Sequence, residues 1–408
     1  MRHKVTHHFW LLDGVRIAAF IWTVALHTEA MLFLAAPADQ VEGHYNRSAK
    51  MFWHRLLFWQ GHFALDIFML LSGFLFSASC SPSEKGSLWI GVSSCLVRRL
   101  RRLAPLYYLV LTVHLLTPAP RKENAWRAFL FLSNTVSVEQ QYLPHTWSVS
   151  LDVQATIALY LLHRWAASTP TRRSGAETAP ECRRVTARLA SAAIIFTLYG
   201  VGMSSWLVYG EQRFRLPLKV LGHEAFRNSG VDLSSAYQTF YEIVYLSLPV
   251  RLPAYLVGSV LWHMKYGRGI STAVPEPHKL GLSFLATALW YSCLALPFSS
   301  SAGLADYSAI TSVGVAAVAR PAAALATAIL LYAWLPNKQK LPEPHQQPLE
   351  GSLRSEALER VERLGVCQVE SIESVGGGAK ELKTRFEAKW SVEALDSSTQ
   401  MVLITHSE

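Results

Sequence analysis

Long apolar stretches separated by short polar segments recur through the first 336 residues of the chain. A helix needs about 20 mostly apolar residues to cross a bilayer, and several stretches reach or approach that length. The pattern predicts an all-α fold, a polytopic transmembrane helix bundle of about eight spans. These spans are expected at 9–35, 56–79, 103–118, 145–163, 187–209, 241–263, 280–297 and 308–335. The apolar segment 126–136 is too short to cross and is expected to be interfacial or re-entrant.

Composition and charge also favour a membrane protein. Charged residues make up 16% of the chain and hydrophobic residues 51%, whereas an ordinary soluble domain has about 25% charged residues. The net charge is +9, but the basic residues cluster beside the apolar stretches, where they orient a protein or bind anionic lipids and phosphates. We therefore expect the lipid bilayer as a partner, and not nucleic acid. The five cysteines are scattered and lack the spacing of metal ligands, so we expect no metal site.

The basic residues also predict an orientation. With the N-terminus inside, the inner segments hold more Lys and Arg than the outer ones, so both chain ends are expected in the cytoplasm. Beyond Pro336 no further span follows, and twelve acidic residues stand against nine basic ones. We therefore expect a transmembrane domain at 1–336 and a polar tail at 337–408, whose Pro-rich start is typical of a linker and whose composition allows disorder.

The first expected span carries two ionisable residues, Arg16 and His27, with ten residues between them. Eleven steps of about 100° return a helix to within about 20° of its starting direction, so the two side chains share one face. Ionisable groups inside a span are costly and commonly mark a functional site. The alternative is an interfacial arginine and a hydrogen-bonded core histidine.

An aspartate, Asp66, lies in the apolar second span. An unpaired carboxylate there would be protonated rather than charged, so Asp66 needs a partner, for which His27 and Arg16 are candidates. Ser72 and Gly73 follow it and are small enough to allow two helices to approach closely, so a packing role is equally open.

Two further clusters have both a structural and a functional interpretation. Arg98, Arg99, Arg101 and Arg102 precede the third span, either as a topology anchor or as a site for phosphate groups. In 144–154, Ser148 and Asp152 fall on one helical face, although a polar residue here can simply cap the helix. Arg320 and Pro321 open the last span, where the proline predicts a kink.

In this order the clusters resemble the acyltransferase 3 family of integral membrane acyltransferases, including its nose-resistant-to-fluoxetine branch. The matching motifs are Leu12 to Arg16 with His27, Asp66 to Phe74, Arg98 to Pro105, and Trp147 to Gln154. The chain departs from the family pattern at Ile17, Asp152, Val153 and Ala155, where many members have glycine, glutamate, a carboxylate and an aromatic residue. Members typically have about ten spans, so the resemblance leads us to expect that the last two are missing here.

The resemblance implies an acyltransferase of the class that transfers groups other than aminoacyl groups, with acyl-CoA as co-substrate and no bound cofactor. The acyl group would pass from cytoplasmic acyl-CoA to a hydroxyl of a carbohydrate, lipid or other extracytoplasmic acceptor. His27 would act as general base or carry the acyl group briefly, because imidazole titrates near operating pH. Asp152 or Asp66 would orient His27, and Arg16 would hold a donor phosphate or stabilise developing negative charge.

The resemblance further implies substrate contacts outside this catalytic group. Arg98, Arg99, Arg101 and Arg102 would bind the CoA phosphates, and Ser72, Trp147 and Ser148 would line the substrate site. Two other classes of function stay open. The buried charges would also suit a transporter of an organic anion or of protons, and a truncated relative would bind a partner without catalysis.

Overall fold

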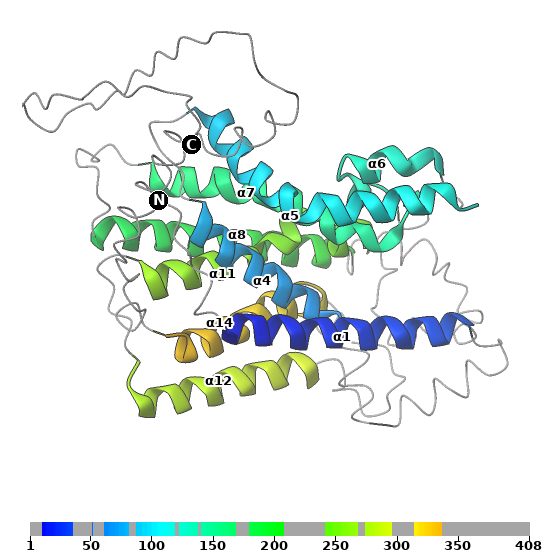
Figure 1. The fold of residues 1–408 in the computed structure, drawn as a ribbon. Coiled ribbons are helices and arrows are strands. Elements are labelled where there is room, and N and C mark those ends of the chain that lie inside the picture. Colours follow the sequence, from blue (N-terminus) through cyan, green and yellow to red (C-terminus); the bar gives the residue numbers. More distant parts are fainter. Residues whose placement is uncertain are drawn as a thin grey trace, which may run out of the picture. The chain divides into compact units, whose positions relative to one another are not determined.

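The computed structural model describes residues 10–35, 51, 61–80, 87–118, 122–137, 140–168, 179–207, 241–267, 274–295 and 314–336. These residues form helices and turns, with no strand among them. The main helices (Figure 1) are α1 (Trp10–Ala35), α4 (Phe63–Ser79), α5 (Leu88–Leu116), α6 (Ala125–Phe129), α7 (Trp147–Ala167), α8 (Ala179–Ser205), α11 (Leu248–Tyr266), α12 (Glu276–Ala295) and α14 (Ala319–Trp334). They belong to one compact unit, Met1–Pro342. The expected tail at 337–408 lies outside the described residues.

Each expected span overlaps one of these helices, and the fold class is all-helical in the described part of the chain. Three helical segments are long and apolar enough to cross a membrane: Trp10–Thr28, Pro180–Ser205 and Glu242–Tyr266. Two shorter apolar helices, Phe63–Ser79 and Ala319–Trp334, accompany them. The count of eight spans stays a prediction. The segment 126–136 contributes only the five-residue helix α6 and a short turn, which is too short to cross.

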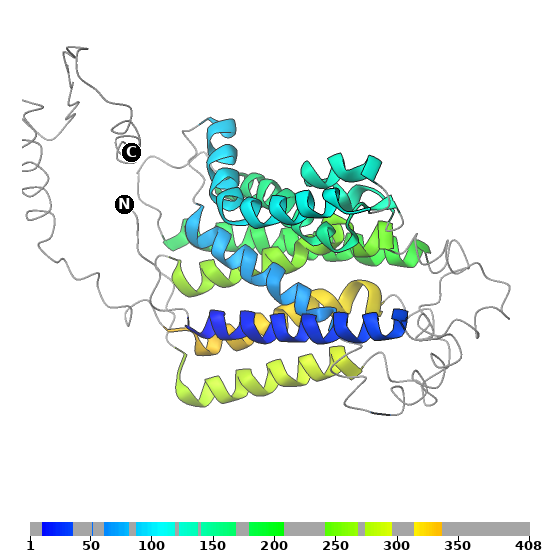
Figure 2. The same cartoon turned by 45° about the vertical axis from the view of Figure 1, so that its right-hand side comes forward.

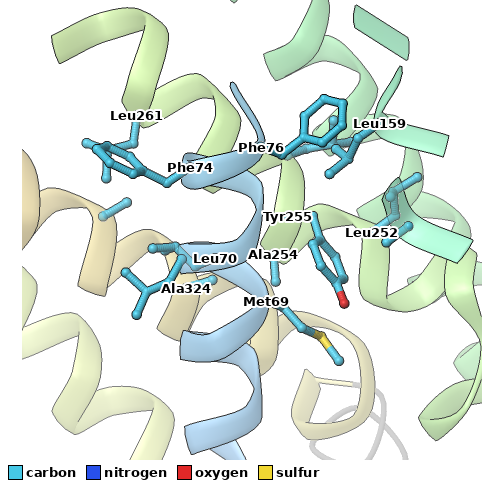
Figure 3. Packing of buried hydrophobic residues seen from close by; sticks show 14 of the residues in the cluster. Met69, Leu70, Phe74, Phe76, Leu159, Leu252, Ala254, Tyr255, Leu261 and Ala324 are labelled. Carbon is cyan, nitrogen blue, oxygen red and sulfur yellow. The ribbon is translucent and has the colours of Figure 1, made fainter. Parts of the chain in front are cut away.

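Helix α4 lies at the centre of the bundle and packs against α1, α7, α11 and α14. Its apolar side chains are almost fully buried because it has neighbours on several sides, and Leu70 and Phe74 are 0% exposed. Figure 3 shows Leu70 and Phe74 beside Ala324 of α14 and Leu261 of α11. A helix that is apolar around its whole circumference has to be buried in this way, inside a protein or a membrane.

Close approach of α4 and α11 depends on two glycines. A Cβ atom added to Gly73 would lie 1.9 Å from the carbonyl oxygen of Tyr255, and one added to Gly258 would lie 1.9 Å from that of Leu70. The Ser259 hydroxyl donates a hydrogen bond to the carbonyl oxygen of Gly73 across this contact, at 3.2 Å. The packing interpretation of Gly73 is therefore confirmed, and the contact holds the polar residues of both helices in register.

Helices α1 and α5 show two further features of a membrane protein. The outer face of α1 is apolar, with Ile17, Phe20 and Ile21 exposed, as expected for contact with lipid rather than water.

Helix α5 is bent (Figure 2) and contains Pro105, which has no N–H group to donate a hydrogen bond to the carbonyl of Arg101. The proline therefore gives a physical reason for a bend next to the arginine cluster.

Candidate active site

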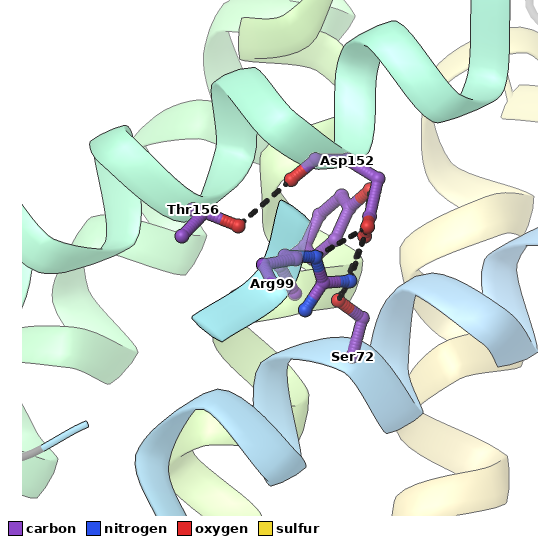
Figure 4. A network of polar contacts seen from close by, with 5 residues as sticks. Ser72, Arg99, Asp152 and Thr156 are labelled. Carbon is purple, nitrogen blue, oxygen red and sulfur yellow. Dashed lines mark hydrogen bonds and ion pairs between the residues drawn. The ribbon is translucent and has the colours of Figure 1, made fainter. Parts of the chain in front are cut away.

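A polar cluster lies between α4, α5, α7 and α11, and Figure 4 shows Ser72, Arg99 and Asp152 directed toward one another. Arg99 Nε donates to Asp152 Oδ2 at 2.5 Å, and Arg99 Nη2 forms an ion pair with the same carboxylate. Ser72 accepts a hydrogen bond from Arg99 Nη2 at 2.5 Å and donates one to Asp152 Oδ1 at 2.8 Å. The hydroxyl of Tyr255 lies 3.4 Å from Asp152 Oδ1. The guanidinium and the two hydroxyls together surround the carboxylate of Asp152.

This cluster separates Arg99 from the other three arginines of its segment. Arg98, Arg101 and Arg102 are exposed on α5, whereas Arg99 is mostly buried against Asp152. The structure therefore leaves Arg98, Arg101 and Arg102 at the surface of α5 and assigns only Arg99 to the central cluster.

Asp66 has two arginine partners in the structure. Arg251 Nη1 donates to Asp66 Oδ1 at 2.8 Å, and Arg320 Nη1 lies 3.4 Å from Oδ2. Asp66 and Arg251 are each 1% exposed. The expected partner role thus belongs to Arg251 and Arg320 rather than to His27 or Arg16. The sequence offered one signal for Arg251: it is the single Lys or Arg residue in the apolar span 241–263.

Aromatic rings surround this buried ion pair. The guanidinium carbon of Arg251 lies 4.3 Å from the ring centroid of Tyr245 and 5.6 Å from that of Trp147. The two rings lie 5.0 Å apart in an edge-to-face arrangement. Trp147, one of the expected substrate contacts, is therefore part of the wall around Arg251. Ser148, another of them, directs its hydroxyl toward the carbonyl of His145 at 3.4 Å, which is a weak local contact.

His27 and Arg16 both lie on α1, and each has a local partner. His27 Nδ1 lies 2.8 Å from the carbonyl oxygen of Thr23. Because a carbonyl only accepts hydrogen bonds, Nδ1 carries a proton, and in the neutral ring Nε2 is the nitrogen with the lone pair. Arg16 forms an ion pair with Asp13 at 2.8 Å. A backbone carbonyl, and not Asp66 or Asp152, orients the His27 ring among the contacts that the structure describes.

A second histidine, His145, lies in the turn Pro144–Thr146 directly before α7. Its side chain is exposed, so the imidazole can accept or donate a hydrogen bond to a ligand. Sequence reasoning gave this residue no role.

The structure also pairs two cysteines that sequence reasoning left without a role. Cys80, just after α4, and Cys95 in α5 form a disulfide with a Cα–Cα distance of 6.1 Å. Arg98 Nη2 lies 3.1 Å and 3.2 Å from the two sulfur atoms. The disulfide links the first part of α5, next to the arginine cluster, to the C-terminal end of α4. Among the described residues, no group of histidine, cysteine and carboxylate side chains could hold a metal ion.

We expect this disulfide to protect two of the five cysteines from alkylation in denatured protein until a reductant is added. In Cys80→Ser, Cys95 should react without reductant, while Cys293→Ser serves as the control and should leave the pair protected. Mass spectrometry after iodoacetamide treatment measures the adducts. Full labelling of the wild type without reductant would contradict the pairing. If Cys80 and Cys95 are already protected in freshly lysed cells, this end of the bundle lies in an oxidising compartment. That result would contradict the expected orientation, which places the arginine cluster on the cytoplasmic side.

The comparisons with known proteins agree with the resemblance in the motifs. A family model described as an acyltransferase domain matches residues 9–344, which include α1 to α14 and every residue of the central cluster. No curated protein and no solved structure matches the chain at a significant level. Family membership implies acyltransferase activity in general and a membrane location. Since the match covers most of the 408 residues, the chain belongs to the acyltransferase 3 family.

Proposed function

We propose that the protein crosses the membrane several times and transfers an acyl group from acyl-CoA to a hydroxyl group of an extracytoplasmic or membrane-bound acceptor. The observation that carries this proposal is the orientation of His27. Its Nδ1 faces the Thr23 carbonyl, so Nε2 is the nitrogen with the lone pair in the neutral ring, and the side chain is exposed. A base oriented in this way matches the requirements of general base catalysis.

The reaction then needs one proton transfer and one exchange of bonds. The acceptor hydroxyl donates its proton to His27 Nε2 while its oxygen attacks the thioester carbonyl carbon. The carbon–sulfur bond breaks, an ester forms, and CoA leaves with the proton that His27 accepted. His145, which is exposed in the turn before α7, holds the acceptor by a hydrogen bond in this proposal.

The arginines divide into two roles in this proposal. Arg98, Arg101 and Arg102 are exposed and form the site for the CoA phosphates, because a guanidinium binds phosphate with two hydrogen bonds. Arg99 is a positioning residue, since its contacts with Asp152 and Ser72 hold α5 against α7 and α4. Arg16, which pairs with Asp13 on the first span, holds a donor phosphate or stabilises developing negative charge in this proposal.

The double variant Arg98→Gln/Arg102→Gln should raise the KM for acyl-CoA severalfold and change kcat little, because a contact remote from the reacting atoms contributes uniform binding. The difference in KM between the variant and the wild type should shrink at high salt, because salt also screens the wild-type contacts. Arg183→Gln/Arg184→Gln, two exposed arginines on α8, is the matched control. Initial rates against acyl-CoA concentration measure the effect. An unchanged KM in correctly inserted protein would leave these arginines as a topology anchor.

The proposed function is tested by expressing the protein with an isotope-labelled acyl donor and recording the masses of lipids and glycans. Acyltransfer predicts acceptors that gain the labelled acyl mass and lose it in the His27→Ala variant. Substrate flux across vesicles without CoA dependence would identify a transporter instead. No labelled product and no flux would favour a relative that binds a partner without catalysis.

A further inference from the structure

We infer that Arg251 forms a subsite for an anionic group of the acceptor, a carboxylate or a phosphate, at the end of the bundle where α4, α11 and α14 begin. This inference rests on the proposed acyl transfer and names the class of acceptor: a hydroxyl compound that carries a negative charge. Its basis is the incomplete hydrogen bonding of a buried guanidinium.

The hydrogen bonds of Arg251 can be counted atom by atom. Its Nε donates to the carbonyl oxygen of Tyr245 at 2.8 Å, and its Nη1 donates to Asp66 Oδ1 at 2.8 Å. Its Nη2 is buried and has no hydrogen-bond partner among the described residues. Both N–H groups of Nη2, in a charged side chain that is 1% exposed, thus lack an acceptor among the described residues. Buried polar groups are nearly always satisfied, and a charged donor left alone costs free energy.

The missing partner has to be an acceptor, because a guanidinium only donates. An anionic oxygen fits best for two reasons. Charge-assisted hydrogen bonds are about twice as strong as neutral ones, and Nη2 belongs to a charged guanidinium that is 1% exposed. The rings of Tyr245 and Trp147 lie against the guanidinium and reduce the access of water to the site. Low water access strengthens the attraction for an anion.

Helix α1, which carries His27, packs against α4, which carries Asp66, the carboxylate partner of Arg251. Trp147, whose ring contacts Arg251, begins α7 directly after the turn that contains His145. An acceptor could therefore place its anionic group at Arg251 and a hydroxyl at His27 Nε2. Binding of this kind fixes the acceptor at a second point and orients the reacting hydroxyl.

Thermal unfolding of the purified full-length protein in detergent tests the subsite independently of activity. Sodium acetate and sodium phosphate serve as probes, with sodium chloride at equal ionic strength as the reference. The Tm of the wild type should be higher with one probe or both than with sodium chloride, because a ligand that binds the folded state stabilises it. The probe with the lower apparent Kd tells a carboxylate from a phosphate. Arg98→Gln/Arg102→Gln should keep the gain, which excludes binding at the exposed arginines.

Variants of Arg251 complete this test. Arg251→Gln should weaken the probe at least about tenfold, as expected for a lost charge-assisted hydrogen bond. If Arg251→Gln does not fold, Arg251→Lys keeps the charge without the planar fork and should also bind the probe about tenfold more weakly. No Tm gain in wild type, or equal probe affinity in wild type and in the folded Arg251 variant, would overturn the subsite.

The acceptor class is tested by separating the labelled products on an anion-exchange column. Retained products would support an anionic acceptor, and neutral products would overturn it. The proposed function fails in a different way: neither free CoA nor labelled product forms, although the anion-dependent gain in Tm persists. An anion site would then exist in a protein that does not transfer acyl groups.

Discussion

The His27→Ala variant should lose at least about a hundredfold in the rate of acyl transfer, the usual effect of removing a general base. The structure gives the reason: Thr23 holds Nδ1, so Nε2 is the group that can accept the acceptor's proton. Stability should change little, because the side chain is exposed and its described hydrogen bond is to its own helix. Free CoA formed by purified, folded protein measures the rate.

The matched control for this variant is His278→Ala, a histidine exposed on α12. Its rate should equal that of wild type, which excludes a general effect of losing an imidazole. His145→Gln is the informative comparison, because a residue that only holds the acceptor should raise the KM for the acceptor more than it lowers kcat. A folded His27→Ala protein with the wild-type rate would contradict the mechanism.

The Asp66→Ala variant should lose about 3–5 kcal/mol of folding free energy, the range for breaking a buried ion pair. The loss is large because Arg251 stays buried without its carboxylate partner, and Arg320 loses the same contact. Thermal unfolding in detergent, with helix content as the signal, measures the effect as a fall in Tm.

Glu276→Ala provides the control for Asp66→Ala. Glu276 forms an ion pair with Lys279 at 2.6 Å, but its side chain is 79% exposed. Exposed pairs contribute about 0–1 kcal/mol, so this variant should unfold near the wild-type temperature. The double variant Asp66→Leu/Arg251→Met should recover part of the loss, because it leaves neither of these two charges unpaired. Equal unfolding temperatures of Asp66→Ala and wild type would contradict the structural role of the pair.

The periodicity of apolar residues predicted the helices well because it is a local property. Each expected span overlaps a helix, and the close packing at Gly73 follows from the size of the residue. Partners across helices were harder to predict. Asp66 and Arg251 are 185 residues apart, and the need for a partner, which the apolar surroundings of Asp66 indicated, does not identify that partner. The packing of α4 against α11 determines which residue becomes the partner of Asp66.

The arginine cluster shows the same limit. Sequence reasoning treated Arg99 as equivalent to Arg98, Arg101 and Arg102, because four neighbouring arginines have the same chemistry. The structure directs Arg99 toward Asp152 and leaves the other three exposed, which depends on the direction of each side chain around α5. The disulfide between Cys80 and Cys95 likewise depends on how α4 and α5 meet, and spacing alone does not reveal it.

The most direct measurement of the central claim is the formation of free CoA by the purified protein in lipid vesicles, with acyl-CoA supplied and a glycan and lipid extract added as acceptor. The account predicts CoA release that depends on the acceptor extract, with the acyl mass recovered on an acceptor, and almost none of either with His27→Ala. An absence of acceptor-dependent CoA release by the wild type, or equal release by a folded His27→Ala variant, would contradict it.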